Sequence, residues 1–211
     1  MLRVAAVVLA AGRSSRFQAA GGAEATKLVA KLEGRPIVRS AVDAALASRA
    51  SPVVVVVGHA RGAVEAAVEG SPVTIAFNPD FEAGIASSLK VGLAAAPPGC
   101  DGAVVLLGDM PNVAPRLIDD LIAAFEARPT AQAVAPIRDG RRGNPVLLSR
   151  TLFGEAMDLV GDEGARRLLL ALEPGAVAEI AAASDVSFDV DTPDDLAVAR
   201  TKKREPPGRS G

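Results

Sequence analysis

The chain has 211 residues, a formal net charge of −2 at pH 7 and an apolar share of 49%, which is enough for the core of one α/β domain. It has no Tyr or Trp and six Phe, and it lacks a basic excess, so we expect no nucleic-acid partner. The single cysteine, Cys100, rules out an internal disulfide and a cysteine-rich metal site.

Short apolar segments alternate with helical patterns along the first two thirds of the chain. The segments are rich in Val or Leu and bounded by Gly, Pro, Asn or Asp, which predicts buried strands at residues 4–10, 52–57, 73–77, 102–107 and 131–136. Helices are predicted between them at residues 36–48, 60–68, 84–95 and 115–127. This alternation predicts a mostly parallel sheet with helices on both faces, which binds ligands at the carboxyl ends of its strands.

The last third of the chain is less regular. A turn is predicted at residues 141–143, and the elements after it are a strand at 145–149, helices at 152–159 and 165–172, and strands at 176–180 and 186–190. Thr192 is the predicted N-cap of a last helix, with Pro193 at its first position and acids in its first turn. We expect residues 1–200 to form a single domain and the basic, Pro/Gly-rich residues 201–211 to be disordered.

A loop of small residues follows the first predicted strand and comprises Leu9, Ala10, Ala11 and Gly12. Backbone N–H groups in such a loop bind phosphate oxygens, and Arg16 and Lys27 would neutralise a triphosphate. The loop matches neither the Walker A pattern nor Gly-x-Gly-x-x-Gly. A plain turn after the strand is an equally good interpretation of the glycine.

Acidic residues lie at or just beyond the ends of two predicted strands. Asp109 follows Gly108 at the end of the strand 102–107, where a carboxylate is well placed to hold Mg²⁺ against a triphosphate. Asp189 and Asp191 lie on one face of the last predicted strand, and the helix start at Thr192 does not explain Asp191. Asp191 is therefore the candidate for a second Mg²⁺ ligand, whereas a role in a turn is the alternative for Asp109.

Other polar residues lie at element boundaries. Asn78 follows a predicted strand, and Ser87 and Ser88 lie in the first turn of the next helix, where free N–H groups suit an anion or the edge of a nucleobase. Arg141 and Arg142 precede a strand, and paired guanidinium groups can bind a phosphate bidentately. Turns and solvent-exposed surface are the alternative interpretations.

Taken in order, these motifs resemble those of molybdenum cofactor cytidylyltransferases, within the MobA-like NTP transferases. The resemblance runs from Val4 to Ala199 and rests mainly on residues 108–111, 142–146, 161–166 and 189–193. It implies a Rossmann-like nucleotidyltransferase fold and Mg²⁺-dependent transfer of CMP from CTP to the terminal phosphate of molybdenum-bound molybdopterin. Leu-Ala-Ala-Gly at residues 9–12 favours CTP, because the guanylyltransferase type usually has Leu-Ala-Gly-Gly.

The resemblance also implies roles for individual residues. The nucleotide-binding residues would be Leu9, Ala10, Ala11, Gly12, Lys27, Gly58, Asn78, Ser87, Ser88 and Asp109. The catalytic residues would be Arg16, Lys27, Asp109 and Asp191, with both acids binding Mg²⁺, and Arg142 and Asn144 would contact the acceptor. The chain departs from the pattern twice: residues 17–26 separate Lys27 from the arginine, and Asn144 replaces a common His.

Several alternatives remain open from the sequence. The same chemistry would serve GTP, a sugar 1-phosphate or methylerythritol phosphate, and a non-catalytic chaperone of the molybdenum cofactor would share the fold. A recipient molybdoenzyme or its chaperone is a further candidate partner. The apolar residues 4–11 are too few to span a membrane and lead into the glycine loop, so we expect a cytoplasmic protein without a membrane partner.

Overall fold

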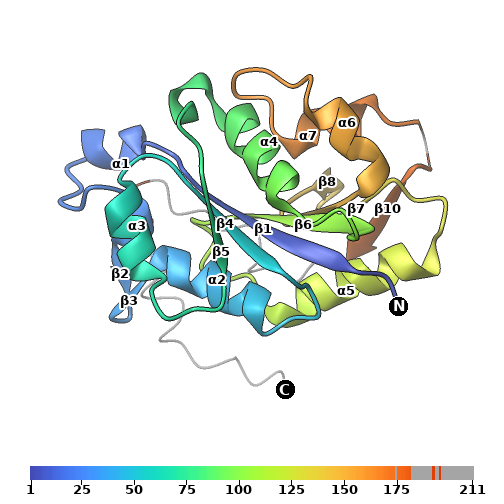
Figure 1. Ribbon diagram of the computed structural model, residues 1–211, viewed down its shortest axis with the longest axis horizontal. Helices are drawn as coiled ribbons and strands as arrows, with labels where there is room; N and C mark the ends of the chain where they lie inside the picture. The colour runs from blue at the N-terminus through green and yellow to red at the C-terminus, as the bar shows by residue number, and fades with distance from the viewer. Residues whose placement is uncertain (174, 182–191, 193–194, 196–211) are drawn as a thin grey trace.

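A mostly parallel sheet forms the centre of the molecule in the computed structural model, which describes residues 1–173, 175–181, 192 and 195 (Figure 1). Its central strands are β1 (Val4–Ala10), β4 (Val53–Val57) and β6 (Gly102–Leu107). Their residues are almost all buried, as in sheets that are covered on both faces. The outer strands are β5 (Thr74–Phe77), β7 (Ala133–Arg138), β9 (Val146–Ser149) and β10 (Val177–Ala181).

The strand order is β10-β7-β9-β6-β1-β4-β5, and β9 runs antiparallel to both of its neighbours. The pairs of β1 with β4 and β6, of β4 with β5 and of β7 with β10 are parallel. The predicted Rossmann-like α/β fold with a mostly parallel sheet is therefore confirmed. The strands β1, β4 and β6 end side by side, so the loops that follow them meet at one edge of the sheet.

Helices cover both faces of the sheet (Figure 1). One face packs against α2 (Ile37–Leu46), α3 (Arg61–Ala67) and α5 (Pro115–Ala127), and the other against α4 (Ile85–Ala95), α6 (Phe153–Ala156) and α7 (Ala165–Ala171). The alternation of side chains along β1 divides them between the two cores: Val4, Ala6 and Val8 on one side and Ala5, Val7 and Leu9 on the other.

The strands and helices predicted for residues 4–136 are all present, with ends that differ by a few residues. The prediction missed the short elements between β1 and α2. These are α1 (Ser15–Ala19), the 3₁₀ helix η1 (Lys27–Val29) and the hairpin of β2 (Lys31–Leu32) and β3 (Arg35–Pro36). The 3₁₀ helix η2 (Phe81–Ala83), which precedes α4, was also missed.

The predicted turn at residues 141–143 was wrong. Residues Arg141–Arg142 form strand β8, which pairs antiparallel with β7, and the turn lies just before it at Asp139 (φ 49°) and Gly140 (φ 72°). Asp-Gly favours such a turn because both of its residues tolerate positive φ. The helix predicted at 152–159 is likewise shorter: the 3₁₀ helix η3 (Arg150–Leu152) leads into α6, which ends at Ala156.

A reciprocal pair of hydrogen bonds marks the start of the last predicted helix. The backbone N–H of Asp195 donates to Thr192 Oγ1 (3.1 Å), and the backbone N–H of Thr192 donates to Asp195 Oδ2 (2.8 Å). This reciprocal pattern resembles a capping box and is the one expected of Thr192 as an N-cap, while the residues of the predicted helix other than Asp195 lie outside the described part of the chain. The predicted strand 186–190, Asp191 and the tail 201–211 lie outside the described residues. Within the described part of the chain, no helix is long and apolar enough to cross a membrane.

Candidate functional site

A cavity of about 700 Å³ opens at the carboxyl edge of the sheet, where the loops after β1 and β6 meet. The loop after β1 and the start of α1 form one wall with residues 11–17, and Lys27, Leu28 and Asp109 lie beside them. A second wall consists of residues 81–85 and Ser88, around the start of α4, together with Gly161 and Asp162. The cavity therefore lies where the fold class predicts a ligand.

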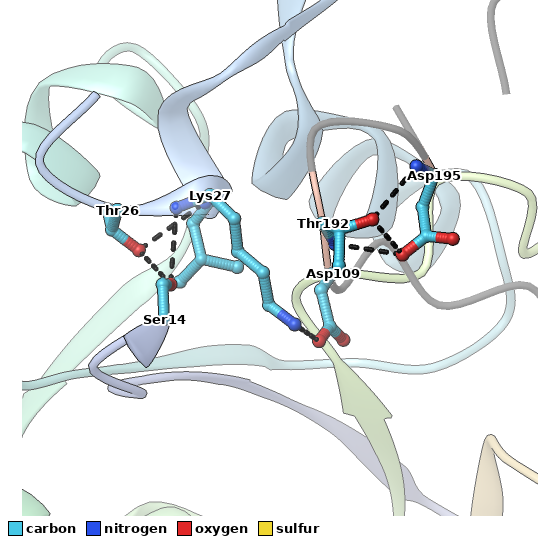
Figure 2. A network of polar contacts seen from close by, with 7 residues as sticks. Ser14, Thr26, Lys27, Asp109, Thr192 and Asp195 are labelled. Carbon is cyan, nitrogen blue, oxygen red and sulfur yellow. Dashed lines mark hydrogen bonds and ion pairs between the residues drawn. The ribbon is translucent and has the colours of Figure 1, made fainter. Parts of the chain in front are cut away.

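Two hydroxyl groups hold the start of η1 against the loop after β1 (Figure 2). Ser14 precedes α1 with a left-handed backbone (φ 56°), and its Oγ lies 2.8 Å from Oγ1 of the fully buried Thr26. The backbone N–H of Lys27 also donates to Ser14 Oγ, at 3.2 Å. The segment 17–26 thus returns to its starting point, and Lys27 reaches the cavity despite the residues that separate it from Arg16.

Lys27 and Asp109 form an ion pair inside the cavity (Figure 2). Lys27 Nζ lies 2.7 Å from Asp109 Oδ2, and the two side chains are 13% and 17% exposed. The second carboxylate oxygen, Oδ1, is buried and accepts no hydrogen bond from the described residues. A buried oxygen without a donor is costly, so this carboxylate is suited to a further cation.

These residues fit a magnesium ion that shares its ligands with a substrate. Mg²⁺ prefers one or two carboxylates and takes its other ligands from phosphate and water. Among the described residues, no group of three or more His, Cys, Asp or Glu side chains forms a closed metal cage. Asp109 alone therefore fits an open, partial ligand set, and the second predicted ligand, Asp191, lies outside the described residues.

Three cationic side chains line the cavity: Arg13, Arg16 and Lys27. Arg13 Nη1 lies 3.5 Å from Oε1 of Glu82, which stands on the second wall, and both side chains are exposed. All three cations come from the segment between β1 and the end of η1, so positive charge gathers on one side of the cavity. This arrangement suits a polyanion such as a triphosphate.

Asn78 supports the second wall from behind. It is buried, and its Nδ2 donates to Ser87 Oγ (2.8 Å) and Ser88 Oγ (3.0 Å), while its Oδ1 accepts from the backbone N–H of Asp80. Of the three predicted residues Asn78, Ser87 and Ser88, only Ser88 lines the cavity. The structure thus assigns Asn78 to holding the loop that contains η2 against α4.

The small residues of the predicted phosphate loop take different positions. Leu9, Ala11 and Gly12 line the cavity, whereas Ala10 points into the core below it. Gly58 is not part of the lining. A Cβ atom at Gly58 would lie 2.7 Å from Phe81 Cβ and 2.8 Å from Ala11 Cβ, so the glycine allows Phe81 to approach the end of β1.

The two predicted acceptor residues lie apart from this cavity. Arg142 is on β8, and its guanidinium donates to Glu179 Oε1 (2.8 Å) and to the carbonyl of Leu169 (3.2 Å). Asn144 precedes Pro145 across a cis peptide bond. Neither residue lines the cavity, so the structure does not bring them together with Asp109, and their role stays a prediction.

Several lining residues received no role from the sequence. They are Arg13, Ser14, Ser15, Phe17, Leu28, Phe81, Glu82, Ala83, Gly84, Ile85, Leu107, Gly161 and Asp162. The glycine-rich segment at residues 161–164 was visible as a motif, but nothing in the sequence indicates that it meets the start of α4. The residues 81–83 gave no signal, because a short 3₁₀ helix has no hydrophobic period of its own.

Comparison with known proteins agrees with this geometry. The MobA-like NTP transferase domain family matches residues 6–177. The chain is 33% identical to the purine catabolism protein PucB of Bacillus subtilis over 92% of this chain and 94% of that one. It is 27% identical to the molybdenum cofactor cytidylyltransferase of Escherichia coli over 97% and 100% of the two chains. It is also 34% identical to the bifunctional protein GlmU of Sorangium cellulosum, but it spans only 29% of that protein's length.

Solved structures show the same relationship. The crystal structure of Rv0371c from Mycobacterium tuberculosis H37Rv superposes with a TM-score of 0.81 and 30% identity, covering 95% of this chain and 98% of that one. A structure of Rv0371c in complex with manganese superposes with a TM-score of 0.75 over 94% and 98% of the chains. The chain therefore belongs to the MobA-like NTP transferase family of nucleotidyltransferases.

Proposed function

We propose that this nucleotidyltransferase transfers CMP from CTP to the terminal phosphate of molybdenum-bound molybdopterin, giving molybdopterin cytosine dinucleotide and pyrophosphate. The Lys27–Asp109 pair carries the proposal, because it combines a cation for phosphate with a carboxylate whose second oxygen is buried and has no hydrogen-bond donor among the described residues. The end-to-end similarity to the cytidylyltransferase of Escherichia coli supports this acceptor. The Leu-Ala-Ala-Gly sequence at residues 9–12 supports CTP.

The residues of the cavity are suited to catalysis by positioning and by charge neutralisation. The loop after β1 binds phosphate oxygens through its backbone, and Arg16 and Lys27 hold the pyrophosphate as it leaves. The phosphate of the acceptor attacks the α-phosphorus in line, so no covalent enzyme intermediate forms. This phosphate is ionised at neutral pH, and the reaction therefore needs no general base.

Asp109 would hold Mg²⁺ together with Asp191, which remains a sequence prediction. When bound, Mg²⁺ supplies positive charge at the phosphate oxygens. The Oδ1 of Asp109, which is buried without a donor in the described part of the chain, supports this assignment, as does the manganese complex of the related mycobacterial protein. Arg142 and Asn144 remain the proposed acceptor contacts, and a molybdoenzyme or its chaperone is the proposed recipient of the product.

The test is an incubation of the purified protein with Mg²⁺ and molybdenum cofactor, with CTP and GTP in parallel, followed by quantification of pyrophosphate and dinucleotide. Turnover with CTP is expected. A preference for GTP would contradict the assignment of cytosine as the base but would still support nucleotidyl transfer to this acceptor. If folded protein binds CTP but releases no pyrophosphate with this acceptor, the acceptor assignment is wrong, and sugar 1-phosphates and methylerythritol phosphate are the next acceptors to supply.

A further inference from the structure

Two glycines from distant parts of the chain meet in the second wall of the cavity. Gly84 immediately precedes α4 and has φ 97° and ψ 178°, a conformation that is essentially restricted to glycine. A Cβ atom at this position would lie 2.2 Å from the carbonyl oxygen of Gly161, which is far below any normal contact. The same carbonyl accepts a hydrogen bond from the backbone N–H of Ala86 at 3.0 Å. We call this contact the Gly84–Gly161 joint.

The joint ties together two segments that both line the cavity. Residues 81–85 form one segment, and the loop with Gly161 and Asp162 forms the other. The first segment is fixed elsewhere by Asn78, which binds the hydroxyls of α4, and by Gly58, which admits Phe81. The joint is thus the link that sets the position of the segment 81–85 relative to the loop at 161–162.

The chemistry of this wall differs from that of the opposite one. Arg13, Arg16 and Lys27 stand on the side of the β1 loop, whereas the wall at the joint contains Phe81, Ala83, Ile85 and Ser88. A nucleotide whose phosphates lie on the cations turns its nucleoside toward the opposite wall. Glu82 and Asp162 are the charged residues of that wall, and Glu82 pairs with Arg13.

We infer that the Gly84–Gly161 joint fixes the wall against which the nucleoside lies, which makes Gly84 a positioning residue for nucleotide selectivity. The inference rests on the proposed function only in requiring a nucleoside triphosphate as ligand, and it holds for cytosine or guanine and for any acceptor. Substitution of Gly84 should therefore affect the binding of the nucleoside and leave the binding of the phosphates nearly unchanged.

The variant that tests the joint is Gly84→Ala, and two other glycines provide matched controls. Gly92 lies in the same helix, and a Cβ atom there would lie 2.3 Å from Val7 Cγ1 in the core. Gly92→Ala therefore introduces strain into α4 at a position remote from the cavity. Gly70 has a positive φ of 75° with open space around its Cβ position, it does not line the cavity, and asparagine tolerates such a backbone. Gly70→Asn should therefore keep the joint.

The measurement is isothermal titration calorimetry of the wild-type protein and the three variants with CTP, GTP and inorganic triphosphate. Gly84→Ala should weaken the better-bound nucleotide at least about fivefold and change triphosphate binding less than about twofold, because a small displacement of a wall costs mainly the contacts made to it. Gly92→Ala should lower the melting temperature and keep the ratio of nucleotide to triphosphate affinity. Gly70→Asn should keep both the melting temperature and this ratio.

The outcomes separate this inference from the proposed function. Equal losses of nucleotide and triphosphate affinity in Gly84→Ala, or no loss, would overturn the joint alone. GTP could bind more tightly than CTP while Gly84→Ala still lowers the ratio of nucleotide to triphosphate affinity. That result would support the joint and contradict the base assignment. Folded wild-type protein that binds no nucleotide would overturn both.

Hydrogen exchange on the unaltered protein is a second test, which holds even if Gly84→Ala does not fold. The amide of Ala86 donates across the joint, so the better-bound nucleotide should slow exchange in the peptide that contains it. Inorganic triphosphate should leave the exchange of that peptide unchanged. Equal slowing by both ligands would contradict the inference.

Discussion

The two edges of the sheet contain cavities of similar volume that differ in their chemistry. The cavity at the carboxyl edge measures about 700 Å³, and one at the amino edge, between the first residues of the chain and α5, measures about 770 Å³. Each contains a carboxylate in an ion pair: Asp109 with Lys27 at the carboxyl edge, and Glu126 with Arg49 at the amino edge. Their volume and the presence of an ion-paired carboxylate do not distinguish them.

The two cavities differ in how many oxygens of the carboxylate already accept a hydrogen bond. Both oxygens of Glu126 accept from Arg49 Nη2 at 2.9 Å, and Oε1 also accepts from the backbone N–H of Leu2. Asp109 uses one oxygen for Lys27, and its other oxygen is buried with no donor from the residues that the structure describes. The buried acceptor Oδ1 of Asp109 can therefore still bind a ligand, whereas the carboxylate of Glu126 is fully used in holding parts of the fold together.

The largest expected effect is the loss of activity on neutralising Asp109. Asp109→Asn should lower turnover at least about a hundredfold, which is the cost of removing a main electrostatic stabiliser. The matched variant, Glu126→Gln at the amino edge, should keep turnover within about twofold, because its carboxylate joins α5 to Arg49 and to the backbone of Leu2, away from the candidate site. Pyrophosphate release under saturating substrates measures both.

Similar turnover in the two variants would contradict the assignment of the carboxyl edge. Thermal melting of each variant provides the control, because a folded but inactive Asp109→Asn protein separates lost chemistry from lost structure. The comparison of the edges would be reversed if Glu126→Gln were the inactive variant.

Much of the fold could be predicted because its signals are local. The Val-rich run at residues 4–10 lies between loop residues, so hydrophobic pattern and boundaries agree, and β1 has these limits in the structure. Arg141 and Arg142 were wrongly placed in a turn because charged residues resemble a loop, although Asp139-Gly140 contained the stronger turn signal. Residues 15–19 form α1, which is too short to show a helical period.

The candidate site could be predicted only where one residue suffices to indicate a role. Asp109 at the end of a parallel strand and Gly12 after β1 both line the cavity. The hydrogen bonds that return Lys27 to the cavity through Ser14 and Thr26 depend on tertiary structure, which no spacing rule provides. For the same reason, the contact of Gly84 with Gly161 could not be predicted from either motif alone.

The second expected effect concerns the stability that each ion pair contributes. Lys27→Met should lower the free energy of unfolding by about 1–3 kcal/mol, because it removes the cation beside a sheltered carboxylate. Arg49→Met should cost less, since its pair is more exposed, with side chains that are 35% and 27% accessible. Urea unfolding measures both, and equal losses would contradict the contrast between the edges. Adding Asp109→Asn to Lys27→Met should restore part of the loss.

A smaller effect is expected from the serines near the two edges. Ser14 joins the loop after β1 to Thr26 and Lys27, whereas Ser48, after α2, bonds the backbone of Ala45 and Ala50. Ser14→Ala should weaken triphosphate binding about threefold to tenfold, which corresponds to one lost hydrogen bond. Ser48→Ala should leave this binding unchanged, as calorimetry with inorganic triphosphate would show. Weaker binding in both variants would indicate a general loss of structure.

The smallest expected effect is the pH dependence of the amino-edge pair. The hydrogen bond from the Arg49 guanidinium holds the pKa of Glu126 below its ordinary value of 4.5. The folded protein therefore releases this proton more readily than the unfolded chain, and Glu126 contributes stability above pH 4.5 that is lost as the pH falls through the lowered pKa. The difference in unfolding free energy between wild type and Glu126→Gln should be constant near neutral pH and shrink in acid.

Urea unfolding of both proteins from neutral to acidic pH, at low and at high salt, measures this difference. Because the Arg49–Glu126 pair is open to solvent, high salt should reduce the contribution of Glu126 at neutral pH. The loss caused by Lys27→Met should change little with salt, because its pair with Asp109 is sheltered in the cavity. A Glu126 contribution that depends on neither pH nor salt would show that the pair acts through packing, and the electrostatic contrast between the two edges would then be wrong.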